Sequence, residues 1–207
     1  WLGFDLGLGP AADRANSLWD DAFVPMRLAD VLAGVRRDDG RPLVTATEQV
    51  LPHRLAPEPP EAPRRWWPWL LAGLALVAAI AVAGQRRPRA LAGAAMLLWA
   101  ACSVLGAAML FLWLGTEHRF AWGNHNLLLF PPLCLLLLPG GWRLARGRVP
   151  GPVFRVLAWA VVACSVLALF LHLLPVFPQR NAHWIALMLP VHFALAWTLA
   201  QRPRATG

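Results

Sequence analysis

Lysine and tyrosine are absent from this sequence, and acidic residues are scarce. All 19 basic residues are arginines, against 11 Asp and Glu in 207 residues. Ten of those acids lie in residues 1–65, so the rest of the chain carries eleven arginines and Glu117 alone. Charged residues make up 14% of the chain and hydrophobic residues 58%, with a mean hydropathy of +0.50. This composition excludes an ordinary soluble domain and indicates an integral membrane protein.

The excess of arginine gives a formal net charge of +8, which raises the question of a nucleic-acid partner. A nucleic-acid-binding surface needs a basic face with aromatic or helical elements that read the bases. In this chain the arginines stand at the ends of apolar runs instead. We therefore expect no nucleic-acid partner.

The few cysteines, Cys102, Cys134 and Cys164, each fall inside an apolar run. They form no C-x-x-C pair and no spacing typical of metal ligands, so we expect free thiols and no metal site. The chain opens on Trp1 without the basic and apolar regions of a signal peptide. We expect it to be the later part of a longer protein.

Residues 1–52 have the pattern of a short α+β segment. Ser17-Leu18-Trp19-Asp20 fits a capping box, and Pro25 fits the first position of a second helix. Asp38 to Pro42 predicts a turn, and the alternation in Leu43 to Leu51 predicts a strand. So short a segment has few large apolar side chains for a core, so we interpret it as the remnant of a domain that begins upstream.

Residues 53–65 are rich in proline and predict a semi-rigid linker, and residues 66–207 predict a membrane domain. Trp66-Trp67-Pro68-Trp69 is typical of a membrane interface. A span needs on the order of 20 apolar residues. The chain offers five runs of about that length, which predict an all-α five-helix transmembrane bundle: Trp69–Gly84, Leu91–Gly115, Asn126–Trp142, Val153–Pro175 and Ala182–Ala200.

The loops between these runs differ in arginine content, which predicts their side of the membrane. Residues 85–89 and 143–148 carry three arginines each, whereas the two other loops carry only Arg119 and Arg180. Arginine-rich loops remain in the cytoplasm. We therefore expect the segment before the first span to lie outside and the C-terminus inside. Arg64 and Arg65, before the first span, are the exception.

Two polar loops then fall on the outer side, and they hold the candidate functional residues. Glu117 and His118 are residue types that serve as a general base and its orienting carboxylate. The amides and rings beside them, together with the second loop, could hold a carbonyl oxygen or a lipid headgroup: Asn124, His125, Asn126, Arg180, Asn181 and His183. The alternative is that both loops are polar because they lie at the level of lipid phosphates.

Two further histidines lie inside the apolar runs. His172 is about two residues from the outer end of its run, whereas His192 is about ten residues in, roughly 15 Å at 1.5 Å per residue. Axial ligation of a haem needs two rings at matching depth, so we expect no haem and no other cofactor. Hydrogen bonds between helices are the better explanation of these rings.

The order of motifs resembles one bacterial family. The pieces are GFDLGLGPAADRANSLWDDAFVPMRLAD, GRPLV, a proline-rich linker, TEHRFAWGNHNLLLFPPLCLLLLP and QRNAHWIALMLPVH. This series resembles the Lnb-type lipoprotein N-acyltransferases of Gram-negative bacteria. The most specific piece is His118 followed by Asn124-x-Asn126-Leu127-Leu128 and two prolines.

The resemblance implies a large periplasmic domain followed by a five-helix domain in the bacterial inner membrane, with the C-terminus in the cytoplasm. It implies transfer of an acyl chain from a membrane phospholipid to the N-terminal Cys of a lipoprotein acceptor. In such a two-part enzyme the nucleophile can lie upstream of Trp1, in which case this chain supplies membrane placement and part of the site.

Two other functions remain open on the residues alone. The chain can be a non-catalytic anchor or interaction module that holds a periplasmic domain at the membrane. A transporter is a weaker option, because no run carries the charged residues that a coupled carrier usually needs. Convergence of the polar residues on one cavity open to lipid would favour the enzyme over the anchor.

Overall fold

The computed structural model describes residues 2–21, 23–48, 50, 64–176 and 179–200. The described residues form α-helices and 3-10 helices, with one isolated bridge between Arg36 and Pro42 in place of any strand. The chain divides into two compact units. Residues 1–13 and 63–207 form one unit, and residues 14–62 form the other.

The smaller unit keeps the helix signals expected from the sequence. Ser17 and Asp20 cap α2 (Leu18–Asp21) reciprocally, because each backbone N–H meets the other's side-chain oxygen at 3.1 Å. Pro25 opens α3 (Pro25–Gly34), and Gly40, at φ +79°, allows the predicted turn.

The strand predicted for residues 43–51 is wrong over its described part, 43–48 and 50. An extended segment needs a neighbouring strand for its backbone groups, and the described part of the chain offers none beyond the one bridge. The α+β character expected for residues 1–52 is therefore not seen. Most of the proline-rich linker falls outside the described residues.

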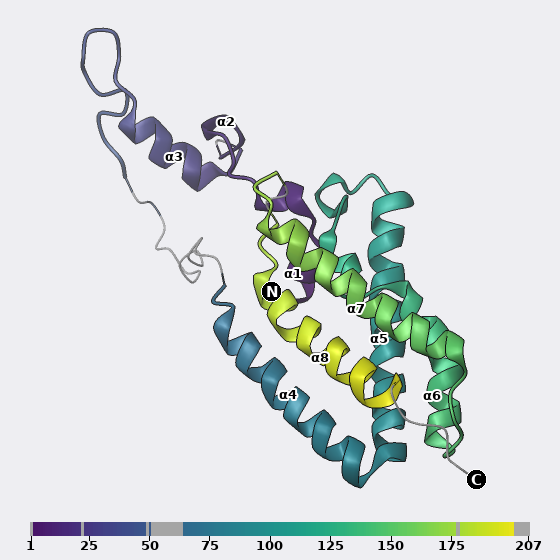
Figure 1. Cartoon of the computed structure of the whole chain (residues 1–207). Helices are drawn as coiled ribbons and strands as arrows, with labels where there is room; N and C mark the ends of the chain where they lie inside the picture. The colour runs from purple at the N-terminus through teal and green to yellow at the C-terminus, as the bar shows by residue number, and fades with distance from the viewer. Residues whose placement is uncertain (1, 22, 49, 51–63, 177–178, 201–207) are drawn as a thin grey trace. The chain divides into compact units, whose positions relative to one another are not determined.

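The five predicted spans are confirmed as five helical segments long and apolar enough to cross a membrane. Four are regular helices: α4 (Trp67–Arg86), α5 (Pro88–Leu114), α7 (Pro152–Leu173) and α8 (Ala182–Ala200). Proline opens α5 and α7 at the first helical position, where its missing N–H does no harm. Helix α8 packs against both α4 and α7, and α5 packs against the remaining span (Figure 1).

The remaining span, His125–Ala145, is broken into three pieces. It consists of η3 (His125–Leu128), η4 (Pro132–Leu137) and α6 (Leu138–Ala145). Pro131 and Pro132 interrupt the backbone ladder between η3 and η4. Irregular backbone at membrane depth is tolerated only where protein covers it, and Leu129 at this break is fully buried.

His192 repairs part of that break. Its Nε2 donates to the carbonyl oxygen of Leu129 over 2.9 Å, although the two residues lie 63 positions apart. This confirms the interpretation of His192 as a hydrogen-bonding group between spans. The ring supplies the donor that a continuous helix would have supplied from its own backbone.

Gly106 of α5 allows the broken span to lie directly against the helix. A Cβ at Gly106 would collide with the carbonyl oxygen of Phe130 and come within 2.8 Å of Pro132 Cδ. The clash involves backbone and a rigid ring, so it is costly to relieve. The position therefore admits only glycine.

Gly106→Ala is expected to destabilise the protein by about 1–3 kcal/mol, the usual cost of overpacking a tight contact. Gly93→Ala on the same helix is the matched control, since a Cβ there has no atom within 4 Å. The control gains helix propensity and is expected to be neutral or stabilising. Thermal unfolding in detergent measures both, and equal melting temperatures would refute the contact.

Candidate functional site

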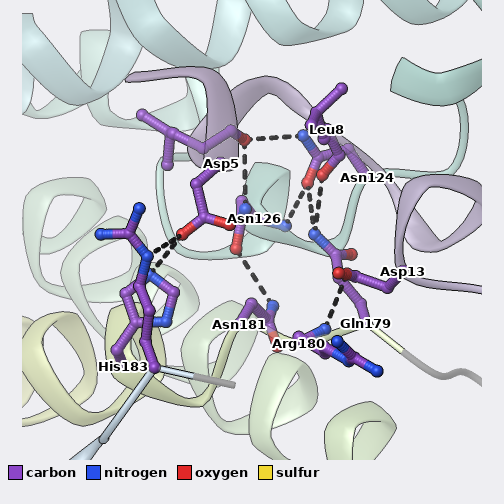
Figure 2. Close-up of polar contacts among 11 residues, drawn as sticks. Asp5, Leu8, Asp13, Asn124, Asn126, Gln179, Arg180, Asn181 and His183 are labelled. Atoms are coloured by element: carbon purple, nitrogen blue, oxygen red, sulfur yellow. Dashed lines mark hydrogen bonds and ion pairs between the residues drawn. The ribbon is translucent and has the colours of Figure 1, made fainter. Parts of the chain in front are cut away.

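The two polar loops meet, as expected from the sequence. The backbone N–H of His125 donates to Oε1 of Gln179 over 2.7 Å, and Nε2 of Gln179 donates to Oδ1 of Asn124 over 2.9 Å. A third bond runs from Nδ2 of Asn181 to Oδ1 of Asn126, at 3.0 Å (Figure 2). Four side chains from loops about 55 residues apart in sequence are therefore joined in one network.

A third segment, which contains α1 (Leu2–Gly7) and η1 (Pro10–Asp13), also takes part in this network of hydrogen bonds. Nδ2 of Asn124 and Nδ2 of Asn126 both donate to the carbonyl oxygen of Leu6, at 2.8 and 3.1 Å. Nε2 of Gln179 donates to the carbonyl oxygen of Leu8 at 3.1 Å. The polar loops thus bind the start of the chain through its backbone.

We call Asn124, Asn126, Gln179 and Asn181 the amide clamp. All four side chains are at most 3% exposed. A buried amide group that lacks a hydrogen-bond partner costs about 1–3 kcal/mol. The network therefore stabilises the protein only while each of its bonds is made. The sequence suggested three of these amides as substrate-binding groups. In the structure their amide nitrogens donate to oxygens of the protein itself, so the clamp fixes the loops around a site.

A carboxylate and a histidine come together beside the clamp. Nε2 of His183 lies 2.8 Å from Oδ2 of Asp5, and Nε of Arg64 lies 3.3 Å from the same oxygen. The geometry of this contact is not that of a linear hydrogen bond, and the pair is ionic only when the ring is protonated. His183 is 2% exposed, and the Trp69 and Trp184 rings lie 5.5 and 5.4 Å from it.

This pair has the composition of a general acid–base unit. A neighbouring carboxylate orients an imidazole and stabilises its protonated form. Close aromatic rings and the burial of His183 keep bulk water away from the ring, which strengthens its electrostatic interaction with the carboxylate. The Asp5–His183 pair can therefore hold and move a proton at a fixed point.

Glu117 and His118 do not join this group. Both side chains are exposed, and Nδ1 of His118 lies 3.1 Å from Oγ1 of Thr116 within its own turn. The carboxylate and the histidine beside the clamp are therefore Asp5 and His183. Asp5 was overlooked in the sequence, although it is a single acid inside the apolar stretch WLGFDLGLG.

The other candidate residues lie at the edge of the same region. The backbone N–H of Arg180 donates to Oδ2 of Asp13 over 2.8 Å. Burial raises the pKa of Asp13, and this hydrogen bond and the charge of Arg180 oppose that rise. His125 is half-buried and contacts the clamp through its backbone.

Two cavities lie at this site, one lined by His183 and the other by the preceding residue, Ala182. The first, of about 510 Å³, is polar and is lined by residues that include Asp13, Arg64, Gln179, Arg180 and His183. The second, of about 800 Å³, is lined almost wholly by apolar side chains of α4, α7 and α8. The two have four lining residues in common: Trp66, His172, Leu173 and Ala182. They therefore form one amphipathic groove.

Comparison with known proteins identifies the membrane part of the chain. Residues 65–202 match the family model described as the Lnb transmembrane domain. Neither the curated proteins nor the solved structures contain a match to this sequence.

Proposed function

The chain belongs to the Lnb transmembrane-domain family, and from this premise we propose that it is the membrane part of a lipoprotein N-acyltransferase. The enzyme would move an acyl chain from a membrane phospholipid to the N-terminal Cys amine of a lipoprotein. The observation that supports the proposal most is the contact of the buried His183 ring with the half-buried Asp5 carboxylate, beside a groove that is apolar along one part and polar at its mouth.

The transfer requires a proton to move from the attacking amine to the departing alcohol. The amine nitrogen forms a bond to the ester carbonyl carbon, the bond from that carbon to the glycerol oxygen breaks, and the proton lost by the amine ends on the released alcohol. His183 is suited to carry that proton, because the Asp5 carboxylate, 2.8 Å from its Nε2, favours the protonated ring by its charge. A nucleophile upstream of Trp1 would divide the transfer into two steps with the same proton balance.

The proposed orientation puts this site on the periplasmic face of the inner membrane and the C-terminus in the cytoplasm. The arginine-rich loops at 85–89 and 143–148 support it, because the side chain of Arg89 lies against Gly147. Both loops therefore belong to the same end of the bundle. Arginines concentrated at one end are typical of the cytoplasmic side.

The second candidate function is a membrane anchor for a periplasmic domain. The outward position of Glu117 and His118 favours it, since these groups touch neither cavity. The burial of His183 beside Asp5 favours the enzyme instead, because an anchor has no use for a buried histidine paired with a carboxylate.

A chimera separates these two functions. In the complete protein encoded by the gene, residues 66–200 are replaced by an unrelated five-span domain of the same orientation. We expect loss of lipoprotein N-acylation, measured by mass spectrometry of N-terminal lipopeptides from cells that depend on this enzyme. The native protein and a chimera with only α3 replaced are the controls. Undiminished acylation in the first chimera would establish the anchor.

A further inference from the structure

The amphipathic groove is built by three helical stripes that converge. Leu70, Leu74 and Val77 lie on one face of α4, and Val162, Val166 and Leu169 lie on one face of α7. The α8 stripe runs through Ile185, Ala186, Leu189, Pro190 and Phe193. Since each stripe follows helical spacing, the groove runs along the helices, in the direction that lipid tails take.

The mouth of the groove carries charge at the level where the apolar lining ends. Arg64 and Arg180 both line it, together with the carboxylate of Asp13 and the ring of His183. Arg64 contacts Asp5 through Nε, and a guanidinium carries five N–H donors, so donors remain for a further oxygen ligand. Guanidinium groups bind phosphate oxygens in bidentate geometry.

Arg64 also departs from the arginine distribution of the rest of the chain. Together with Arg65 it precedes the first span on the side whose two loops between spans carry only Arg119 and Arg180. Arg64 contacts Asp5 and lines the mouth of the groove. We therefore assign it to the charged site at the mouth, and not to setting the orientation of the protein in the membrane.

We propose that the groove binds one glycerophospholipid, with an acyl chain between α4, α7 and α8 and its phosphate against Arg64 and Arg180. The cavity of about 800 Å³ lies in the range of about 300–1,000 Å³ typical of small-molecule sites. The ester groups of such a lipid fall where the cavities join, at His172 and Ala182, next to His183. The proposal rests on the acyl-transfer function only in naming this lipid the donor.

Photolabelling tests the site without any acyl transfer. The purified full chain, in nanodiscs, is exposed to phosphatidylethanolamine that carries a diazirine on one acyl chain, and labelled peptides are identified by mass spectrometry. We expect labels concentrated on α4, α7 and α8. Unlabelled phospholipid should compete, whereas diacylglycerol at the same concentration should compete about tenfold less well, since it lacks the charge-assisted bonds to phosphate.

Two pairs of variants test the two halves of the groove. Ala186→Phe fills the apolar part and is expected to reduce labelling at least fivefold, whereas Ala108→Phe, exposed on α5, is not. The double variant Arg64→Gln with Arg180→Gln is expected to abolish the advantage of phospholipid over diacylglycerol, whereas Arg119→Gln, exposed on the other loop, keeps it. Melting temperatures confirm that each variant is folded.

The outcomes separate this proposal from the function. Labels spread evenly over all five spans, or equal competition by diacylglycerol, would show ordinary boundary lipid and overturn the site, whatever the acylation assay gives. If labelling is selective but the five-span chimera is still active in acylation, the groove is a lipid-binding site and the bound lipid is not the acyl donor.

Discussion

Replacing His183 with alanine in the complete protein is expected to lower lipoprotein N-acylation by about 10²-fold or more. That is the usual loss on removing a positioned general base. His183 is 2% exposed and lies 2.8 Å from the Asp5 carboxylate, so water cannot easily replace its ring. The measurement is the fraction of N-acylated lipopeptide per amount of enzyme in the membrane.

His118→Ala is the matched control, because His118 is exposed in a separate turn beside Thr116. We expect its acylation to remain within about twofold of the native level. Membrane abundance and melting temperature show whether either variant has lost its fold. If His118→Ala abolishes acylation and His183→Ala does not, the base is the residue first suggested by the sequence, and the Asp5–His183 pair is structural.

Asn126→Asp is expected to be the most destabilising single change in the amide clamp. The substitution keeps the shape of the side chain but turns the Nδ2 donor toward Leu6 into an acceptor that faces a carbonyl oxygen. Asn126 is fully buried, so the new carboxylate either remains charged with one oxygen against the Leu6 carbonyl or takes up a proton. We expect a loss of about 3 kcal/mol or more in the free energy of unfolding.

Thermal unfolding of the purified chain and limited proteolysis of residues 1–13 measure this effect. The proteolysis readout matters because the bond to Leu6 holds that segment against the loops. Gln85→Glu is the control: it makes the same change from amide to carboxylate at an exposed position beside Arg86 and Arg87. Its effect should stay within about 1 kcal/mol. Equal melting temperatures for the two variants would refute the clamp.

The spans could be predicted because each is a local property of the sequence. Length and apolar composition within about 20 residues suffice to identify a helix that crosses a membrane. The meeting of the two polar loops followed as well, since both lie on the same side of antiparallel neighbours. The break at Pro131 and Pro132 was visible as a pair of prolines, yet its repair by His192 was not, because the partner lies 63 positions away.

The clamp could not be predicted for the same reason. Asn124 and Gln179 bind the carbonyls of Leu6 and Leu8, and these contacts join positions 118 and 171 residues apart. A backbone carbonyl leaves no mark in the sequence, so side chains that bind one look like free polar groups. Asp5 was missed because an acid near the start of a soluble-looking segment gives no sign that it meets a histidine of the last span.

The first thirteen residues and the residue that precedes the first span, Arg64, lie close together. Asp13 and Arg64 line the same cavity, and Arg64 is paired with Asp5. The two described residues that flank positions 14–63 in the sequence are therefore held close together within the larger unit, so the intervening sequence joins two neighbouring ends. The entropy of closing such a loop grows only as the logarithm of its length, about 0.6 kcal/mol for each doubling. The segment between these two ends can consequently be lengthened, shortened or exchanged in evolution with little effect on the stability of the membrane domain.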